Sequence, residues 1–478
     1  MVGGLTAARL WAAPRPKLLV LVVLEQFRGD YLDALLPQLP PGGFRKLFEK
    51  GSWFPDCRHL ASGFSSTGLA TIATGAWPAQ HGIVADSWYD AASKARVRAS
   101  DESLLATTLL EEISRDANSH ISVVSMDAAH GRLFAASSDA NLYWMDQGGV
   151  FQTYGAAPDW LRQFNDRRAP ENHRNDRWIV PGVKPDAPPL RTLAYDPAHP
   201  EDFVALYKAS PFGQEAQFDL ASELIVRDRM GQTGVTDVLC VLSGSTELLG
   251  YETGADSRLM EQMILHLDRR LESLLTQLAK SPGEGNFNLL LTASHGAPDI
   301  PPDTARARMA VDGEALAHRI DRVLSDRGLG RVDKYLYPFL YLDTSGFRDA
   351  EEIRKAAGRA ALELPAVADY FTAGGASSAQ DEWQRRFRNS FHPRRSGDVM
   401  LAYHPEYVEE FGPKRGISYG SIYNYDARVP LAMYGPAFRA GVYERMVESV
   451  DVAPTLARVL GTALPSSATG RVLSEAMA

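Results

Sequence analysis

The sequence predicts an α/β fold: a doubly wound, mostly parallel sheet with helices on both faces and an inserted cap. Three aliphatic runs of strand length carry this prediction, at Leu18–Leu24, Val238–Leu242 and Phe287–Leu291. Strands that are apolar on both faces are typical of a buried parallel sheet. Helical patterns of roughly 8–20 residues alternate with these runs, as expected for repeated β-α units.

The other elements follow the same alternation of strands and helices. Ser257–Leu278 is expected to form a long amphipathic helix, with apolar side chains recurring on one stripe. Residues 65–74 are expected to form a helix opened by serines, which are good N-caps. Val452–Leu460 is the last predicted helix and is stopped by Gly461. The remaining predicted elements are helices at Gly43–Gly51 and Leu104–Ser114 and strands at Ile121–Met126 and Val429–Tyr434.

Two segments interrupt the alternation. Residues 147–200 are rich in Pro, Asp, Asn and Arg and are expected to form an irregular insertion. Residues 301–413 contain helical runs at 314–327 and 350–363 and a strand-like run at 334–342, and are expected to form the cap. The predicted organisation is a core of residues 17–300, the cap of residues 301–413, and a final core segment of residues 414–478.

Composition excludes several classes of protein. The chain has 478 residues, of which 45% are hydrophobic and 23% charged, as in an ordinary globular enzyme. Its net charge of −9 argues against nucleic acid or an anionic membrane as the main partner. No apolar run approaches the ~18 residues of a transmembrane helix. The two cysteines, Cys57 and Cys240, are expected to stay unpaired. Met1–Pro16 shows no clear signal peptide, so the localisation is left open.

Polar side chains gather where the predicted strands end. In an open parallel sheet, reacting groups collect at the carboxyl ends of the strands. A cluster at that edge is what a metal site or an acid–base site would use. The residues at or near these ends are Glu25, Ser65, Ser66, Thr67, Glu247, Tyr251, Ser294, His295 and Tyr419.

Several segments match the sequence motifs of one known family, in the same order along the chain. They are residues 23–32, 74–75 with Pro78, 81–84, 88–90, 291–296, 425–426, 429–431 and 450–456. The chain resembles the alkaline phosphatase superfamily, in its branch of type I phosphodiesterases/nucleotide pyrophosphatases and threonine-nucleophile alkaline phosphatases. The resemblance implies a doubly wound core with a cap and metal-dependent hydrolysis of small-molecule phosphate mono- or diesters. It also implies two zinc ions and, for many members, export from the cell.

The resemblance places residues of this chain at the family's functional positions. Ser65 stands at the nucleophile, Glu25 at an early Asp ligand, and Glu247 at the Asp of the second zinc. His295 is retained. Three ligand positions are altered, because Tyr251, Ser294 and Tyr419 stand where the family has His, Asp and His.

These changes argue against two zinc ions. Zinc prefers imidazole, thiolate or carboxylate ligands, and tyrosine with a pKa near 10 is a poor ligand at neutral pH. Glu25, Glu247 and His295 are compatible with a single harder ion, such as Mg²⁺ or Mn²⁺.

The positions that hold the phosphoryl oxygens in the family are also altered here. They correspond to Asp86, Ala128 and His130, and an aspartate repels a phosphate dianion.

Three functions remain open from the sequence. The first is a hydrolase of phosphate or sulfate esters with an altered or single metal and Ser65 as nucleophile. The second is an inactive pseudoenzyme that uses the old cleft for binding or assembly, with Tyr251 and Tyr419 filling the space of the metals. The third is metal-free acid–base chemistry by Glu25 and Glu247. A purely structural role is the alternative for these residues: Ser65–Thr67 would cap a helix, and His295 would form a hydrogen bond to the backbone.

Overall fold

The computed structural model describes residues 16–115, 119–182, 184, 187–299, 309–376, 381–405, 407–409 and 418–478. Its centre is one large mixed sheet in the order β20-β2-β19-β11-β1-β10-β5-β6-β7, with β21 pairing on β2. Its strands are β1 (Leu18–Leu24), β2 (Ser52–Arg58), β5 (Ile121–Ser125), β6 (Asn141–Met145), β7 (Phe151–Thr153), β10 (Asp237–Ser243), β11 (Phe287–Ala293), β19 (Arg428–Tyr434), β20 (Gly441–Val442) and β21 (Val447–Glu448).

The predicted mostly parallel, doubly wound sheet is confirmed. β1 lies between β10 and β11 and is parallel to both, and β5 and β6 continue the parallel run. Strand β19 is antiparallel to β11 and β2, and β7 is antiparallel to β6. All seven residues of β1, β10 and β11 are buried, which agrees with their apolar sequences.

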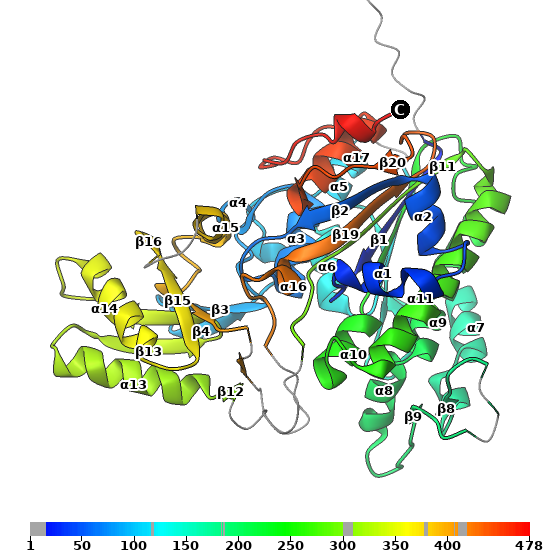
Figure 1. The fold of residues 1–478 in the computed structure, drawn as a ribbon. Coiled ribbons are helices and arrows are strands. Elements are labelled where there is room, and N and C mark those ends of the chain that lie inside the picture. Colours follow the sequence, from blue (N-terminus) through cyan, green and yellow to red (C-terminus); the bar gives the residue numbers. More distant parts are fainter. Residues whose placement is uncertain are drawn as a thin grey trace, which may run out of the picture.

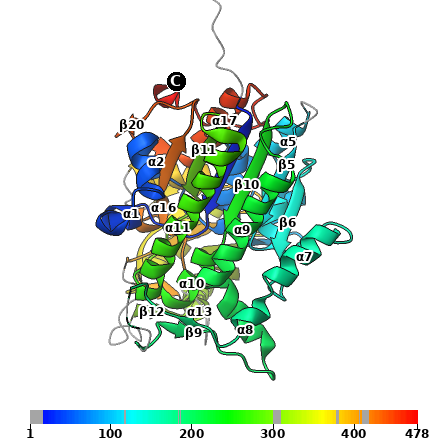
Figure 2. The same ribbon diagram turned by 90° about the vertical axis from the view of Figure 1, so that its right-hand side faces the viewer.

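Helices cover both faces of this sheet. Helices α9 (Pro211–Arg227) and α11 (Arg258–Leu278) pack against one another on one face, with α10 (Ser245–Thr253) beside them (Figures 1 and 2). The other face carries α3 (Ser65–Thr74), α6 (Ala128–Ala135) and α17 (Val452–Leu460), of which α6 and α17 both contact α3. The helices α1 (Asp30–Leu35), α2 (Phe44–Lys50), α4 (Pro78–His81), α8 (Pro200–Lys208) and α16 (Asn424–Ala427) complete this part of the molecule.

A second sheet stands apart from the first, as Figure 1 shows. Five antiparallel strands lie in the order β13-β14-β17-β15-β16, with α13 (Gly313–Asp326) and α14 (Ala350–Leu362) packed together beside them. The strands are β13 (Arg331–Leu336), β14 (Phe339–Asp343), β15 (Val367–Thr372), β16 (Gly375–Ala376) and β17 (Val399–Tyr403). This sheet has its own apolar core, around Ile320, Leu340 and Leu401.

A third apolar cluster joins the smaller sheet to the main body. Phe339, Phe371 and Met400 of the smaller sheet pack there with Ile83 and Trp88. Helix α15 (Asp381–Ser390) also contacts α4 of the main body. The predicted domain boundaries at 300/301 and 413/414 lie outside the described residues and stay predictions.

Three local expectations differ from the structure. The single strand expected at 334–342 is the hairpin of β13 and β14, which turns at Tyr337 and Pro338 because proline has no N–H for a strand ladder. The insertion expected at 147–200 is only partly irregular: it holds β7, which joins the main sheet, helix α7 (Asp159–Arg167), and the pair β8 (Arg177–Trp178) and β9 (Arg191–Thr192).

The helix expected from Leu104 begins five residues later. Helix α5 (Leu109–Arg115) starts after Thr108, whose hydroxyl accepts a hydrogen bond from the Glu111 backbone N–H at 3.2 Å. The Glu111 carboxylate in turn accepts one from the Thr108 N–H at 2.6 Å. This reciprocal capping box fixes the start of the helix, and its sequence signature was present at 108–111.

Two expectations from composition are confirmed among the described residues. Cys57 and Cys240 are free thiols and both are buried. None of the described helices is both long enough and apolar enough to cross a lipid bilayer.

Candidate active site

The strand register brings the predicted site residues to one edge of the sheet. Leu24, Ser243 and Ala293 are the aligned last residues of β1, β10 and β11. Two backbone hydrogen bonds continue the pairing one residue beyond these strands. The Glu25 N–H donates to the Ser243 carbonyl, and the Ser294 N–H donates to the Leu24 carbonyl, both at 2.9 Å. Residues that are far apart in sequence therefore leave adjacent strands at the same level.

Ser65 is held at this edge by helix α3. It is the first helical residue and its side chain is fully buried. Gly68 allows the helix to approach β11, because a Cβ there would lie 2.0 Å from the Ser294 carbonyl oxygen. The expected capping by serine is wrong: the Thr67 hydroxyl accepts from the Phe64 N–H at 2.8 Å, which leaves the Ser65 hydroxyl free for other partners.

Ser65 and His295 form a nucleophile–base pair. Ser65 Oγ lies 2.8 Å from His295 Nε2, and His295 Nδ1 lies 2.6 Å from the Gly296 carbonyl oxygen. Because a carbonyl only accepts, Nδ1 carries the proton and Nε2 is the acceptor for the serine hydroxyl. Burial lowers the pKa of His295 to about 4, so its imidazole is neutral at physiological pH.

Glu247 approaches the same hydroxyl from the first turn of α10. Its Oε1 is hydrogen-bonded to Ser65 Oγ and lies 3.9 Å from His295 Nε2. Burial, reinforced by the negative charge of Glu25, raises the pKa of Glu247 to about 8. A hydroxyl has one proton, so Ser65 can donate to His295 while it accepts from protonated Glu247.

Tyr419 closes over this pair. Its ring stacks on His295 with centroids 4.5 Å apart, and its hydroxyl donates to Glu247 Oε1 at 3.1 Å and to Asp86 Oδ2 at 3.3 Å. Tyr251 packs edge-on against the same ring, with centroids 6.5 Å apart. Burial together with the charges of Asp86 and Glu247 raises the pKa of Tyr419 well above its usual value, so the phenol stays protonated.

Asp86 occupies the N-terminal end of α3. Its Oδ1 accepts a hydrogen bond from the Ser66 N–H at 2.9 Å. A helix N-terminus is a ready site for an anionic group, because its N–H groups point outward and the dipole favours negative charge. Here the protein's own carboxylate takes that place, so Asp86 opposes a bound phosphate rather than assisting it.

Glu25 and His130 lie together on the other side of the site. His130 Nδ1 is 2.6 Å from Glu25 Oε2 and 3.0 Å from Asp127 Oδ2. Burial alone lowers the pKa of His130, but Glu25 and Asp127 outweigh it and raise that pKa well above its ordinary value. In the structure, Glu25 contacts His130. A metal ion held by Glu25, Glu247 and His295 stays a prediction.

Comparison with known proteins identifies the family. A sequence model described as type I phosphodiesterase / nucleotide pyrophosphatase matches residues 19–416. The chain belongs to the type I phosphodiesterase / nucleotide pyrophosphatase family. This family, and the fold described above, place it in the alkaline phosphatase superfamily of hydrolases.

Similar proteins span nearly the whole chain. Alkaline phosphatase PhoV of Synechococcus elongatus is 26% identical, over 96% of this chain and 93% of its own length. Alkaline phosphatase PafA of Elizabethkingia meningoseptica is 25% identical, over 99% of this chain and 96% of its own length. The crystal structure of wild-type PafA superposes with a TM-score of 0.85 at 23% identity, covering 98% of this chain and all of that one. The murine ectonucleotide pyrophosphatase/phosphodiesterase 5 shares the fold more distantly, with a TM-score of 0.59.

Two zinc ions, which this family's fold implies, do not fit the donors of this cleft. Zinc binds imidazole, thiolate or carboxylate. Here the Tyr419 phenol is protonated and donates to the carboxylate of Glu247. Ser294 offers only an alcohol, and its Oγ has no hydrogen-bond partner among the described residues. Both ring nitrogens of His295 are already bonded, to Ser65 and to the Gly296 carbonyl.

Asp127 is a site residue that the sequence analysis missed. It caps α6: its Oδ1 accepts from the His130 N–H at 2.9 Å, which directs the other oxygen towards the His130 ring. An Asp directly after the strand ending near Met126, with a His three residues later, was the available signal. Ala128 begins the same helix.

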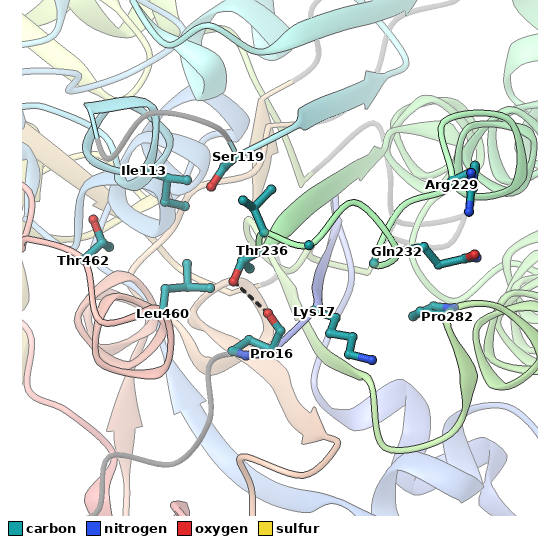
Figure 3. Close-up of a pocket in the computed structure, with 13 residues that line it drawn as sticks. Pro16, Lys17, Ile113, Ser119, Arg229, Gln232, Thr236, Pro282, Leu460 and Thr462 are labelled. Carbon is teal, nitrogen blue, oxygen red and sulfur yellow. Dashed lines mark hydrogen bonds between the residues drawn. The ribbon is translucent and has the colours of Figure 1, made fainter.

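A large hollow lies elsewhere and is not part of this site. It has a volume of about 650 Å³ and is found near the amino ends of β1 and β10, opposite the edge that carries Ser65 (Figure 3). Lys17, Arg229 and Thr236 line it, and the Thr236 hydroxyl donates to the Pro16 carbonyl at 2.7 Å. None of the predicted site residues lines this hollow.

Proposed function

We propose that this chain is an ester hydrolase that uses Ser65 and His295 in place of a two-zinc centre. The observation that carries the proposal is the 2.8 Å contact from Ser65 Oγ to a neutral His295 Nε2 whose other nitrogen is fixed by the Gly296 carbonyl. A nucleophile, a base and a group that orients the base are the parts that acyl- or phosphoryl-transfer to serine requires.

The proposed step moves one proton. Ser65 Oγ attacks the ester, and its proton passes to His295 Nε2, which then protonates the leaving alcohol. A water molecule, deprotonated by the same nitrogen, then attacks the acyl or phosphoryl group, the bond to Ser65 Oγ breaks, and His295 returns the proton to that oxygen. Protonated Glu247, which lies beside Ser65 Oγ, is the proposed donor to the developing negative charge, and the Tyr419 hydroxyl holds Glu247 in place.

Charge limits the substrate class. The helix end beside the nucleophile, which would hold a phosphate dianion, already binds the Asp86 carboxylate. Repulsion between like charges in a buried site costs several kcal/mol. The proposed substrates are therefore esters with at most one negative charge on the reacting group, such as carboxylic esters and phosphodiesters.

The test compares nucleophile variants on chromogenic esters. The protein should hydrolyse p-nitrophenyl acetate or bis-p-nitrophenyl phosphate faster than p-nitrophenyl phosphate. Ser65→Ala and His295→Gln should each lower kcat by about 10³-fold or more. Ser66→Ala is the matched control, because that serine is the next residue of the same helix and its backbone N–H, which binds Asp86, is kept in the variant. Full activity in Ser65→Ala would overturn the proposal.

A second candidate is a catalytically silent binding protein. It is favoured by the burial of Ser65 and His295, both 0% exposed beneath Tyr419. The discriminating measurement is covalent labelling of Ser65 by a fluorophosphonate, detected by mass spectrometry. Labelling supports the hydrolase, and unlabelled Ser65 with no ester turnover supports the binding protein.

The third function, acid–base chemistry by a pair of carboxylates, requires both Glu25 and Glu247, and Glu25 is not available for it. Glu25 is ion-paired with His130 at 2.6 Å and its side chain is 1% exposed. A carboxylate held in this way is not available as a general base beside Glu247, and we do not propose this function.

A further inference from the structure

We propose that Glu25, Asp127 and His130 bind one divalent first-row transition-metal ion, such as Zn²⁺ or Mn²⁺. Two carboxylate oxygens and one imidazole nitrogen lie within 4.8 Å of one another there. This set is separate from the Ser65–His295 pair, so the inference does not rest on the proposed function.

The fold builds these three ligands from two neighbouring strand ends. Glu25 directly follows β1, and Asp127 and His130 lie at the start of α6, two residues after β5. The Asp127 Oδ1 caps the helix by accepting from the His130 N–H at 2.9 Å. That bond holds Oδ2 on the side of the His130 ring, with Nδ1 3.0 Å away. One helix end thus presents two donors towards Glu25.

The state of Glu25 is the second observation that points to a cation. Its side chain is 1% exposed, and neither carboxylate oxygen accepts a hydrogen bond from any described residue. His130 Nδ1 comes within 2.6 Å but does not meet hydrogen-bond geometry. A buried carboxylate without hydrogen bonds is costly unless a charge compensates it. A divalent cation between the three donors would take over the compensation that His130 alone gives and would bind the Glu25 oxygens, which accept no hydrogen bond from any described residue.

The donor types select the class of ion. Mg²⁺ and Ca²⁺ prefer sites built from oxygen alone, whereas an imidazole nitrogen suits Zn²⁺ and Mn²⁺ sites that also contain carboxylates. The ion would displace the proton that His130 otherwise holds between the two carboxylates, and the resulting ligand set of two carboxylates and a neutral imidazole has a charge of −2, which one divalent ion balances. The Asp127 side chain is 44% exposed, so the site is open to solvent on that side and an ion can enter.

Titration calorimetry of chelator-treated full-length protein with Zn²⁺ alone, and separately with Mn²⁺ alone, tests this site. We expect one ion per chain. Glu25→Gln, Asp127→Asn and His130→Gln should each weaken binding by about tenfold or more. Asp127→Asn keeps an acceptor for the helix cap and so guards against loss of folding, which circular dichroism checks. Electron paramagnetic resonance of bound Mn²⁺ gives a readout that needs no activity.

Two controls make the result specific. Asp176→Asn alters a second Asp–His pair with the same spacing of three residues, in which His173 Nδ1 lies 2.9 Å from Asp176 Oδ2, and it should leave binding unchanged. Ser65→Ala should also bind the ion normally, which separates this inference from the proposed hydrolase.

Two outcomes would overturn the site. Absence of binding in the folded wild-type protein would mean that a protonated His130 bridges the two carboxylates instead of a metal. Binding that survives Glu25→Gln but is lost in Glu247→Gln would place the ion on Glu247 and His295.

Discussion

Tyr419 lies face to face with His295, with ring centroids 4.5 Å apart and planes inclined by only 2°. The same tyrosine donates its hydroxyl to Glu247 and Asp86, so one side chain covers the base and ties together two acids. The resemblance to the family predicts a histidine ligand of zinc at this position. Here the ring takes part in an aromatic stack and a hydrogen-bond network.

We predict that the Tyr419 ring covers the Ser65–His295 pair, so its removal should expose the nucleophile. Tyr419→Ala removes the stack, and the rate of fluorophosphonate labelling of Ser65 should rise at least about tenfold, which is about 1.4 kcal/mol of barrier. Tyr419→Phe keeps the ring but removes donors to two acids, which should lower the free energy of unfolding by about 1–3 kcal/mol with little change in labelling. An unchanged labelling rate in Tyr419→Ala would mean that another segment covers Ser65.

The pH dependence of ester hydrolysis should show a plateau between about pH 4 and 8. The lowered pKa of His295, about 4, means that its imidazole is a base above that pH. The raised pKa of Glu247, about 8, means that its carboxyl is a neutral donor below that pH. Above about pH 8, Glu247 is ionised and its negative charge opposes the developing oxyanion, so the rate should fall. Glu247→Gln stays neutral at every pH and should abolish only the alkaline limb; a limb that persists would assign it to another group.

Gly68 sets the distance between α3 and the end of β11. A methyl group there would meet the Ser294 carbonyl oxygen at 2.0 Å, so the helix must move away. Gly68→Ala should therefore cost about 1–3 kcal/mol of stability, measured by urea unfolding, and separate Ser65 from His295. Ester hydrolysis should fall more than stability alone explains. Unchanged stability and kcat would show that the helix end tolerates the shift.

Asp426 should make the protein less stable as the pH rises. Burial raises the pKa of this carboxyl from 3.8 to about 7, while its Oδ2 accepts from the Ser421 N–H at 2.7 Å. The folded state then holds a proton that the unfolded chain has lost, so the stabilisation is complete below about pH 4 and disappears as the pH rises to 7. Asp426→Asn keeps an acceptor without the proton equilibrium.

The measurement is the free energy of unfolding of both proteins at pH 4, 5, 6 and 7. Other groups titrate alike in the two proteins, so the difference between the curves reports Asp426. We expect the variant to gain stability relative to wild type as the pH rises through this window. Parallel curves would contradict the raised pKa.

Restoring the family's ligands should restore the family's pair of zinc sites. The variant carries Glu25→Asp, Glu247→Asp, Ser294→Asp, Tyr251→His and Tyr419→His together, because a zinc site needs three or four ligands at once. Calorimetry should find two Zn²⁺ ions per chain, whereas each single change should add none. Phosphatase activity should return less than binding, because Asp86, Ala128 and His130 still do not hold phosphoryl oxygens. A folded variant without zinc would show that the strand-end loops have moved.

The sequence placed most of the candidate residues at the strand ends but missed Asp127, and it did not predict their contacts. Strand-length aliphatic runs predicted β1, β10 and β11, and parallel strands place their carboxyl ends together, so Glu25, Glu247 and His295 were expected at one edge. Which acid turns towards which partner depends on side-chain directions. Glu25 contacts His130 because Asp127 caps α6, and Glu247 reaches Ser65 because Gly68 lets α3 approach Ser294.

By itself, the sequence determined the fold class, the order of the core elements and the residues at the strand ends. These follow from the spacing of apolar residues and from local signals such as Gly461, which act within a few residues of the chain. Only the tertiary structure decided that Tyr419 stacks on His295 and that Ser65 contacts both His295 and Glu247. Such contacts join residues far apart in the sequence, and packing of the whole chain fixes them rather than any local pattern.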